Sequence, residues 1–204
     1  MVFRHSLTYL VVFLMKQRVR TFVAVEMSEA VRAAAAKVIR QLAKCGATVK
    51  WVEPENMHLT LKFLGDVGTL EIPDVCRAVE DAVAEVPGFT FDVAGVGAFP
   101  KIERPRTIWL GVTQGADELA ALQKQIEKGL KKLGYPPENR RFSPHLTVGR
   151  VKHAGPELVE LSEVIKSLGD QSVGTTAVDE VTVFSSELTR EGPVYQALSH
   201  AGLA

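Results

Sequence analysis

Cysteine is scarce in this sequence. Cys45 and Cys76 are the only two among 204 residues, and they form no C-x-x-C pair. Such a chain has no basis for a disulfide framework or a cysteine-rich zinc site. We therefore expect two free thiols in a reducing compartment, which favours a cytoplasmic location.

An excess of either charge is also absent, because 24 Lys and Arg residues balance 24 Asp and Glu residues. Proteins that coat long nucleic acids usually carry a strong basic excess. The composition therefore argues against a protein that coats a duplex. It is compatible with a pocket that grips one terminal phosphate with a few cations.

Long hydrophobic runs and glycine-rich phosphate loops are missing as well. The apolar run 7–15 is too short to cross a bilayer, and basic residues follow it without a small-residue cleavage site. We interpret residues 1–14 as an N-terminal extension, produced by a mis-assigned start, and expect no membrane association. Residues 15–204 are predicted to form one domain, and we expect a monomer. No dinucleotide fingerprint follows a predicted strand, which disfavours nucleoside triphosphate and nicotinamide chemistry.

What is present is a mixed order of strands and helices. Alternating β-branched residues predict strands, and three- and four-residue apolar spacing predicts helices. Ser28 is a predicted N-cap and Gly46 a predicted helix end. The expected strands are 19–25, 48–52, 58–64, 89–99, 107–112, 145–151, 177–185 and 194–199, and the expected helices are 28–45, 69–86, 116–133 and 156–168. Helices between strand pairs favour an α+β fold over a doubly wound parallel sheet.

A tetrapeptide of the form His, aliphatic, Thr, aliphatic occurs twice, as HLTL at 58–61 and HLTV at 145–148. Side chains alternate between the two faces of a strand. His58 and Thr60 therefore share one face, and His145 and Thr147 share another, while the aliphatic residues point into a core. Each half of the chain would present one imidazole and one hydroxyl to a common cleft.

Two histidines on opposite sides of a phosphorus atom can act as general base and general acid, because the unperturbed pKa of imidazole is near 6.5. The hydroxyls of Thr60 and Thr147 can donate to non-bridging phosphate oxygens. Arg150 lies an odd number of residues after His145, so a flat strand would aim it at the opposite face. A bulge at Gly149 would redirect its guanidinium toward the phosphate.

Two other uses of these residues are less well supported. A histidine or threonine on a strand is ordinarily structural, but the repeated pair in matching register disfavours that interpretation. Zinc sites need three or four ligands, and neither motif is flanked by an H-x-x-E or H-E-x-x-H pattern or by an Asp cluster. We therefore predict no metal ligands and no cofactor.

These motifs resemble those of the 2H phosphoesterase superfamily, and in particular the RNA 2′,3′-cyclic phosphodiesterase family, also called 2′-5′ RNA ligases. The resemblance extends over nearly the whole chain from Met15 onward. It includes RTFVAVEM, NMHLTLKFLGDV, the paired segments GVGAFP and RPRTIWLGV, and RRFSPHLTVGR.

The resemblance implies a bilobal fold with two pseudo-symmetric lobes, antiparallel-rich sheets lining a central cleft, and helices outside. It implies metal-independent hydrolysis of RNA 2′,3′-cyclic phosphate ends, such as those of tRNA fragments, to 2′-phosphomonoesters. By family role His58 is the general acid that protonates the departing 3′ oxygen, and His145 is the base that activates water. Thr60 and Thr147 hold the phosphate.

Three alternatives stay open at this point: a 2′-5′ RNA ligase working in the reverse direction, a phosphodiesterase for small cyclic nucleotides, and a non-catalytic RNA-end binding module. Phe142 is the first candidate for stacking on the terminal base, and Phe63 and Phe99 are others. Five cations in two loops are expected to border the cleft or to be ordinary surface residues: Lys101, Arg104, Arg106, Arg140 and Arg141.

Overall fold

The computed structural model describes residues 17–190 and 192–204. Its strands form two antiparallel sheets. The predicted N-terminal extension, residues 1–14, lies outside the described residues. Sheet A consists, in spatial order, of β3 (His58–Gly68), β1 (Arg18–Glu26), β8 (Glu180–Leu188) and β9 (Pro193–Gly202). Sheet B consists of β2 (Val49–Trp51), β6 (His145–Val151), β5 (Arg104–Val112), β4 (Phe89–Lys101) and β7 (Ser172–Val178).

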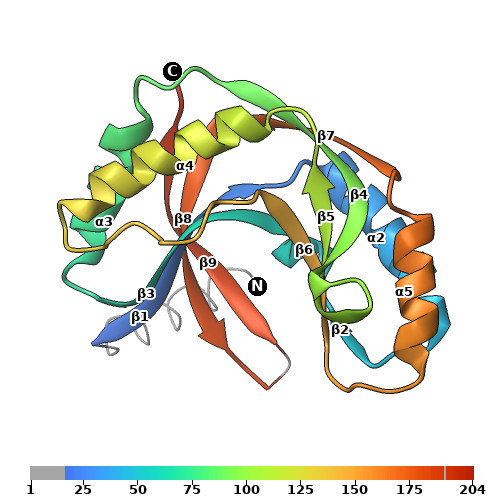
Figure 1. Ribbon diagram of the computed structural model, residues 1–204. Helices are drawn as coiled ribbons and strands as arrows, with labels where there is room; N and C mark the ends of the chain where they lie inside the picture. Colours follow the sequence, from blue (N-terminus) through green and yellow to red (C-terminus); the bar gives the residue numbers. More distant parts are fainter. Residues whose placement is uncertain (1–16, 191) are drawn as a thin grey trace, which may run out of the picture.

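Helices cover the outer face of each sheet, as Figure 1 shows: α3 and α4 lie on one side of the molecule, and α2 and α5 on the other. The helices of the described residues are α2 (Glu29–Leu42), α3 (Ile72–Val83), α4 (Ala116–Lys131) and α5 (Glu157–Ser167), with short 3₁₀ turns η1 (Ala43–Cys45) and η2 (Pro54–Asn56). The predicted α+β fold with two lobes, antiparallel sheets and external helices is confirmed.

The two lobes exchange helices. Helix α2 follows β1 of sheet A along the chain but packs against β7 of sheet B, whereas α4 follows β5 of sheet B but packs against β3 of sheet A. The strand order β3-β1-β8-β9 corresponds to β6-β5-β4-β7, with β2 added beside β6. Each lobe is therefore built from both halves of the chain around a continuous apolar core.

Local sequence signals explain where α2 begins and ends. The hydroxyl of Ser28 accepts a hydrogen bond from the backbone N–H of Val31 at 3.3 Å, which caps the helix. Gly46 follows η1 with φ of 73°, a conformation that glycine adopts without steric cost. Both predicted signals are confirmed.

Two predicted elements differ from the structure. The strand expected at 177–185 is split into β7 and β8 at Asp179, where the chain leaves sheet B and enters sheet A. The segment expected to be a loop between 99 and 107 is largely a hairpin, because β4 continues to Lys101 and β5 begins at Arg104. Both differences arise from pairing with strands far along the chain, which local patterns do not report.

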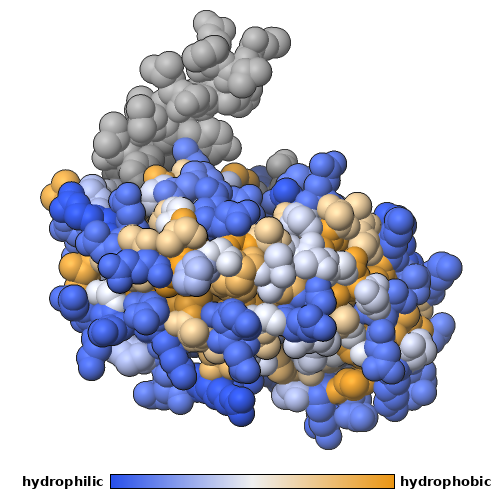
Figure 2. Space-filling model, turned by 90° about the horizontal axis from the view of Figure 1, so that it is seen from above, coloured by the Kyte–Doolittle hydropathy of each residue, from blue (hydrophilic) through white to orange (hydrophobic). Residues whose placement is uncertain are grey.

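The face of the molecule seen from above is mixed in polarity: apolar side chains show near its middle, with hydrophilic ones around them (Figure 2). No helix in residues 17–190 and 192–204 combines the length and the apolar character needed to cross a membrane.

Candidate active site

The two H-x-T-x motifs form the first four residues of β3 and of β6, one in each sheet. Leu59 and Leu146 are fully buried, and the other aliphatic residues of the motifs are buried as well. The histidines and threonines are half-buried and line a cleft between the sheets. The predicted alternation of faces is therefore confirmed.

Both imidazoles are held in the same way. His58 Nδ1 lies 2.8 Å from the carbonyl oxygen of Asn56, and His145 Nδ1 lies 2.8 Å from that of Ser143. Because a carbonyl only accepts, each Nδ1 carries the proton and donates it. The Nε2 of each neutral ring is therefore free to take a proton, and that of each protonated ring to give one.

An aromatic ring meets each histidine edge-on. The ring of Tyr195 contacts His58 with centroids 5.1 Å apart at 89°, and the ring of Phe99 contacts His145 at 5.1 Å and 86°. Phe22 lies beside His58 at 4.8 Å. These contacts limit rotation of both imidazoles. A side chain that transfers protons must be held in one orientation.

A β-bulge falls at the last residue of each motif, Leu61 in β3 and Val148 in β6. The register of β1 against β3 shifts between Thr60 and Lys62, and that of β5 against β6 shifts between Thr147 and Gly149. Each bulge turns the residue five positions after the histidine toward the cleft. That residue is Phe63 in β3 and Arg150 in β6, and both line the cleft. The redirection expected for Arg150 is thus found, at Val148 and Gly149.

The cleft has a volume of about 710 Å³. From sheet A it is lined chiefly by Arg20, Phe22, His58, Thr60, Phe63 and Tyr195. From sheet B it is lined by Lys50, Trp51, His145, Thr147 and Arg150. Two imidazoles, two hydroxyls and a guanidinium thus converge on one space, which suits a phosphate group.

A family model described as the 2′-5′ RNA ligase superfamily matches residues 55–190. The chain belongs to this superfamily. It is 40% identical to the RNA 2′,3′-cyclic phosphodiesterase of Methanothermobacter thermautotrophicus, over 87% of this chain and 95% of that protein. The predicted family is thus confirmed.

Solved structures agree with the superfamily assignment. The crystal structure of the Thermus thermophilus protein TT0787 has a TM-score of 0.76 and 27% identity, covering 90% of this chain and 97% of that one. E. coli LigT complexed with 3′-AMP has a TM-score of 0.70 and 25% identity, covering 92% and 99%. The paired sheets are therefore shared with solved proteins across nearly the whole described chain.

Within this superfamily fold, the electrostatics favour neutral histidines in the unliganded site. Burial has the largest effect and lowers the pKa of His58 below 6.5. The hydrogen bond to the Asn56 carbonyl acts to raise this pKa, and the charge of Arg150 lowers it further. Burial likewise lowers the pKa of His145, against the bond to Ser143, with Arg140 and Arg150 adding to the effect. An anion bound between the rings would offset these cations and raise both pKa values.

The structure brings together most of the predicted site residues but not all. Phe142 packs against the hydrophobic core and does not line the cleft. Phe99 contacts His145 and lies under the guanidinium of Arg140, 5.4 Å from its ring centroid. None of the five candidate loop cations lines the cleft; they are Lys101, Arg104, Arg106, Arg140 and Arg141.

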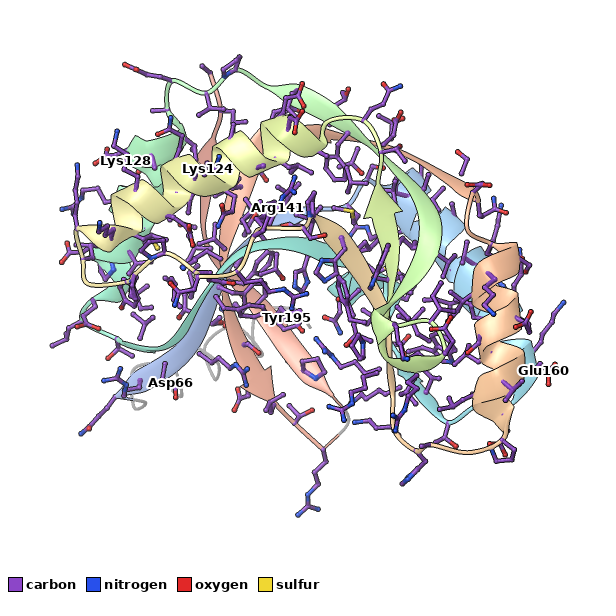
Figure 3. All side chains as sticks on the ribbon, in the orientation of Figure 1. Asp66, Lys124, Lys128, Arg141, Glu160 and Tyr195 are labelled. Atoms are coloured by element: carbon purple, nitrogen blue, oxygen red, sulfur yellow. The ribbon has the colours of Figure 1, made fainter. Side chains whose placement is uncertain are left out.

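Several cleft residues were not found from the sequence. Tyr195 lies on β9 at the far end of the chain and projects into the opening between the sheets (Figure 3). Lys50 and Trp51 precede the first motif by 7–8 positions on the predicted strand 48–52, but only the pairing of β2 with β6 places them at the cleft. Arg20 belongs to a predicted strand, but only the pairing of β1 with β3 and β8 places it at the cleft.

In the described part of the chain, one group of three side chains could hold a metal ion. It consists of Glu26, Glu180 and His200, all exposed, with ligand atoms within 4.8 Å of one another. None of the three lines the cleft. His200 Nδ1 already lies 3.0 Å from a carboxylate oxygen of Glu180.

Proposed function

We propose that this chain hydrolyses RNA 2′,3′-cyclic phosphate ends to 2′-phosphomonoesters by paired-histidine acid–base catalysis without a metal ion. The observation that carries the proposal is the matched geometry of His58 and His145. Both imidazoles present Nε2 to one cleft, and each has a threonine hydroxyl two residues away on the same face. The RNA 2′,3′-cyclic phosphodiesterases among the relatives support the substrate class.

The proposed reaction gives each of these groups one role. The phosphate sits between the histidines, with Thr60, Thr147 and Arg150 donating to its non-bridging oxygens. His145 Nε2 takes a proton from water as the water oxygen bonds to phosphorus. His58, protonated at Nε2, donates its proton to O3′ as the P–O3′ bond breaks. The product keeps the phosphate on O2′, and proton exchange with solvent restores both rings.

The acid and base assignment is supported by Phe63. Phe63 and His58 lie on the same strand, so a base stacked on Phe63 places its ribose on the β3 side of the cleft. The departing O3′ is then on the side of His58, and water enters from the side of His145. The charge of the bound phosphate raises the pKa of His58, which allows this imidazole to be protonated near neutral pH.

The decisive experiment is hydrolysis of a short RNA ending in a 2′,3′-cyclic phosphate, with EDTA present, by wild type, His58→Ala and His145→Ala. Wild type should form the 2′-phosphate, and each variant should lose roughly 10²–10⁴ in rate. His153→Ala is the matched control, because His153 is exposed and does not line the cleft. Activity that EDTA abolishes, or that survives in both active-site variants, would overturn the proposal.

Joining of RNA ends is the second candidate, favoured by the family model itself. If a 5′-hydroxyl occupies the position of the attacking water, the same two histidines would form a 2′-5′ linkage. Adding a 5′-hydroxyl oligonucleotide to the assay should then yield a longer product that depends on both histidines. A non-catalytic binding module would instead bind the cyclic end without any turnover.

A further inference from the structure

The cleft offers more groups for nucleic acid than one cyclic nucleotide can use. A cyclic mononucleotide carries one phosphate and one base, and Arg150 and Phe63 already face these two parts. The cleft is also lined by the cations Arg20 and Lys50. At about 710 Å³ it lies in the upper half of the roughly 300–1,000 Å³ range of sites for drug-sized ligands.

Lys50 lies where the two lobes meet. It pairs with Arg150 across β2 and β6, and its side chain is exposed. A Cβ built on Gly192 would lie 3.4 Å from Lys50 Nζ, so the ammonium reaches the connection between β8 and β9. The cation therefore stands beside Arg150, between β2 of one sheet and the β8–β9 hairpin of the other.

Trp51, the next residue of β2, turns its indole to the other face of sheet B. It pairs with Gly149 across β2 and β6, and a Cβ on Gly149 would lie only 2.7 Å from its Cε3. Because Lys50 pairs with Arg150 and both line the cleft, the indole packs on the core side of β6 and anchors β2, the strand that carries Lys50.

Arg20 supplies the second cation, from β1. It is exposed, lines the cleft, and pairs with Ser186 on β8. Burial raises the pKa of the Tyr195 phenol, while the charges of Arg150 and Arg20 act to lower it. Both guanidinium groups are thus close enough to act on the Tyr195 side chain, which lines the cleft.

Glu53 is the acidic residue among those that line the cleft, and its carboxylate disfavours a phosphate close to it.

We propose that Arg20 and Lys50 form a subsite for the nucleotide that precedes the cyclic end. The two cations hold the phosphate joining the last two nucleosides. This inference rests on the proposed function. It makes the preferred substrate an RNA end of at least two nucleotides rather than a free cyclic mononucleotide.

The test compares kcat/KM for a 2′,3′-cyclic mononucleotide with that for a trinucleotide bearing the same cyclic end. Wild type should favour the trinucleotide by on the order of tenfold, because two cations hold a phosphate that the mononucleotide lacks. Lys50→Gln and Arg20→Gln should each lower this ratio. Lys128→Gln, on the outer surface of α4, should leave the ratio unchanged (Figure 3).

The two substrates together distinguish failure of the proposed function from failure of the subsite. Failure to hydrolyse either substrate would overturn the proposed function. Hydrolysis of both with equal kcat/KM, or a ratio that Lys50→Gln and Arg20→Gln leave unchanged, would overturn the subsite alone. Because both cations are exposed, their variants should fold. The trinucleotide preference of these variants should also depend less steeply on salt than that of wild type.

Discussion

The two lobes of this protein share a motif and differ in the side chain that comes after it. Both present histidine, threonine and then, after a bulge, a side chain directed into the cleft. That last side chain is the aromatic Phe63 in sheet A and the cationic Arg150 in sheet B. The shared part suits proton transfer, which needs a group on each side of phosphorus. The unshared part suits an asymmetric substrate, with a base on one side and a charge on the other.

The bulges themselves are held by different means. In β3 the bulge turns Lys62 into the core, where its Nζ lies 2.7 Å from Glu127 Oε1 and 2.7 Å from the carbonyl oxygen of Pro136. In β6 the corresponding residue is Gly149, covered by the ring of Trp51. One lobe thus fixes its bulge with a buried ion pair, and the other with apolar packing.

The largest effect should come from breaking the ion pair. Burial raises the pKa of Glu127, but hydrogen bonds from Lys62 and from the Glu138 N–H outweigh it, so the net pKa is lowered. Glu127→Gln leaves the ammonium of Lys62 without its carboxylate and should lower the free energy of unfolding by about 3–5 kcal/mol. Urea denaturation measures this loss.

The exposed pair of Glu163 and Lys166 on α5 provides the control for that prediction. Glu163→Gln should leave the denaturation midpoint unchanged, because exposed pairs contribute little. Combining Lys62→Met with Glu127→Leu should recover much of the lost stability, since apolar pairs can replace buried ions. If Glu127→Gln and Glu163→Gln changed the free energy of unfolding equally, the buried pair would contribute no more to stability than the exposed one.

Removing the charge of the second lobe should be the next largest effect. Arg150→Gln takes away a donor for the non-bridging oxygens and should lower kcat by about 10²-fold. Arg150→Lys keeps the charge without the paired N–H donors, so it should recover only part of the rate. Steady-state kinetics on the cyclic-ended RNA distinguishes the variants. Full activity in Arg150→Gln would mean that the guanidinium does not contact the phosphate.

Removing the aromatic ring of the first lobe should act mainly on binding. Phe63 is 53% exposed, so its ring is available to a base and contributes little to the core. Phe63→Leu should raise KM by on the order of tenfold with little change in kcat, because stacking is present in both ground and transition states. Phe142→Leu is the matched comparison: it should leave KM unchanged, since Phe142 packs against the core.

The smallest effect is on pH dependence. The general base must be neutral and the general acid protonated, and both pKa values lie below 6.5 in the free protein. The maximum of kcat/KM should therefore lie below pH 6.5, whichever histidine is the acid. Arg150→Gln removes a cation that lowers both pKa values, so it should move this maximum to higher pH. A wild-type maximum above pH 7 would contradict the prediction.

Much of the site could be predicted from the sequence, and the reason is local. The alternation in HLTL and HLTV assigns each histidine and threonine to one face of a strand, and Gly149 marked the bulge that redirects Arg150. Phe142 packs against the core and does not line the cleft, because proximity to His145 along the chain does not say which side of the backbone a ring takes. Phe63 was ranked below it and is the phenylalanine that lines the cleft.

The order of residues along the chain was enough to predict the strands that carry the motifs, the caps of α2, and the strand face that each histidine shares with its threonine. These depend on residues within a few positions of one another, where periodicity and side-chain type act directly. The three-dimensional fold was needed to establish which strands share a sheet, that α2 and α4 cross to the opposite lobe, and that Arg20, Lys50, Trp51 and Tyr195 join the cleft. Those positions depend on burial of apolar faces contributed by distant segments, which no short window of the chain contains.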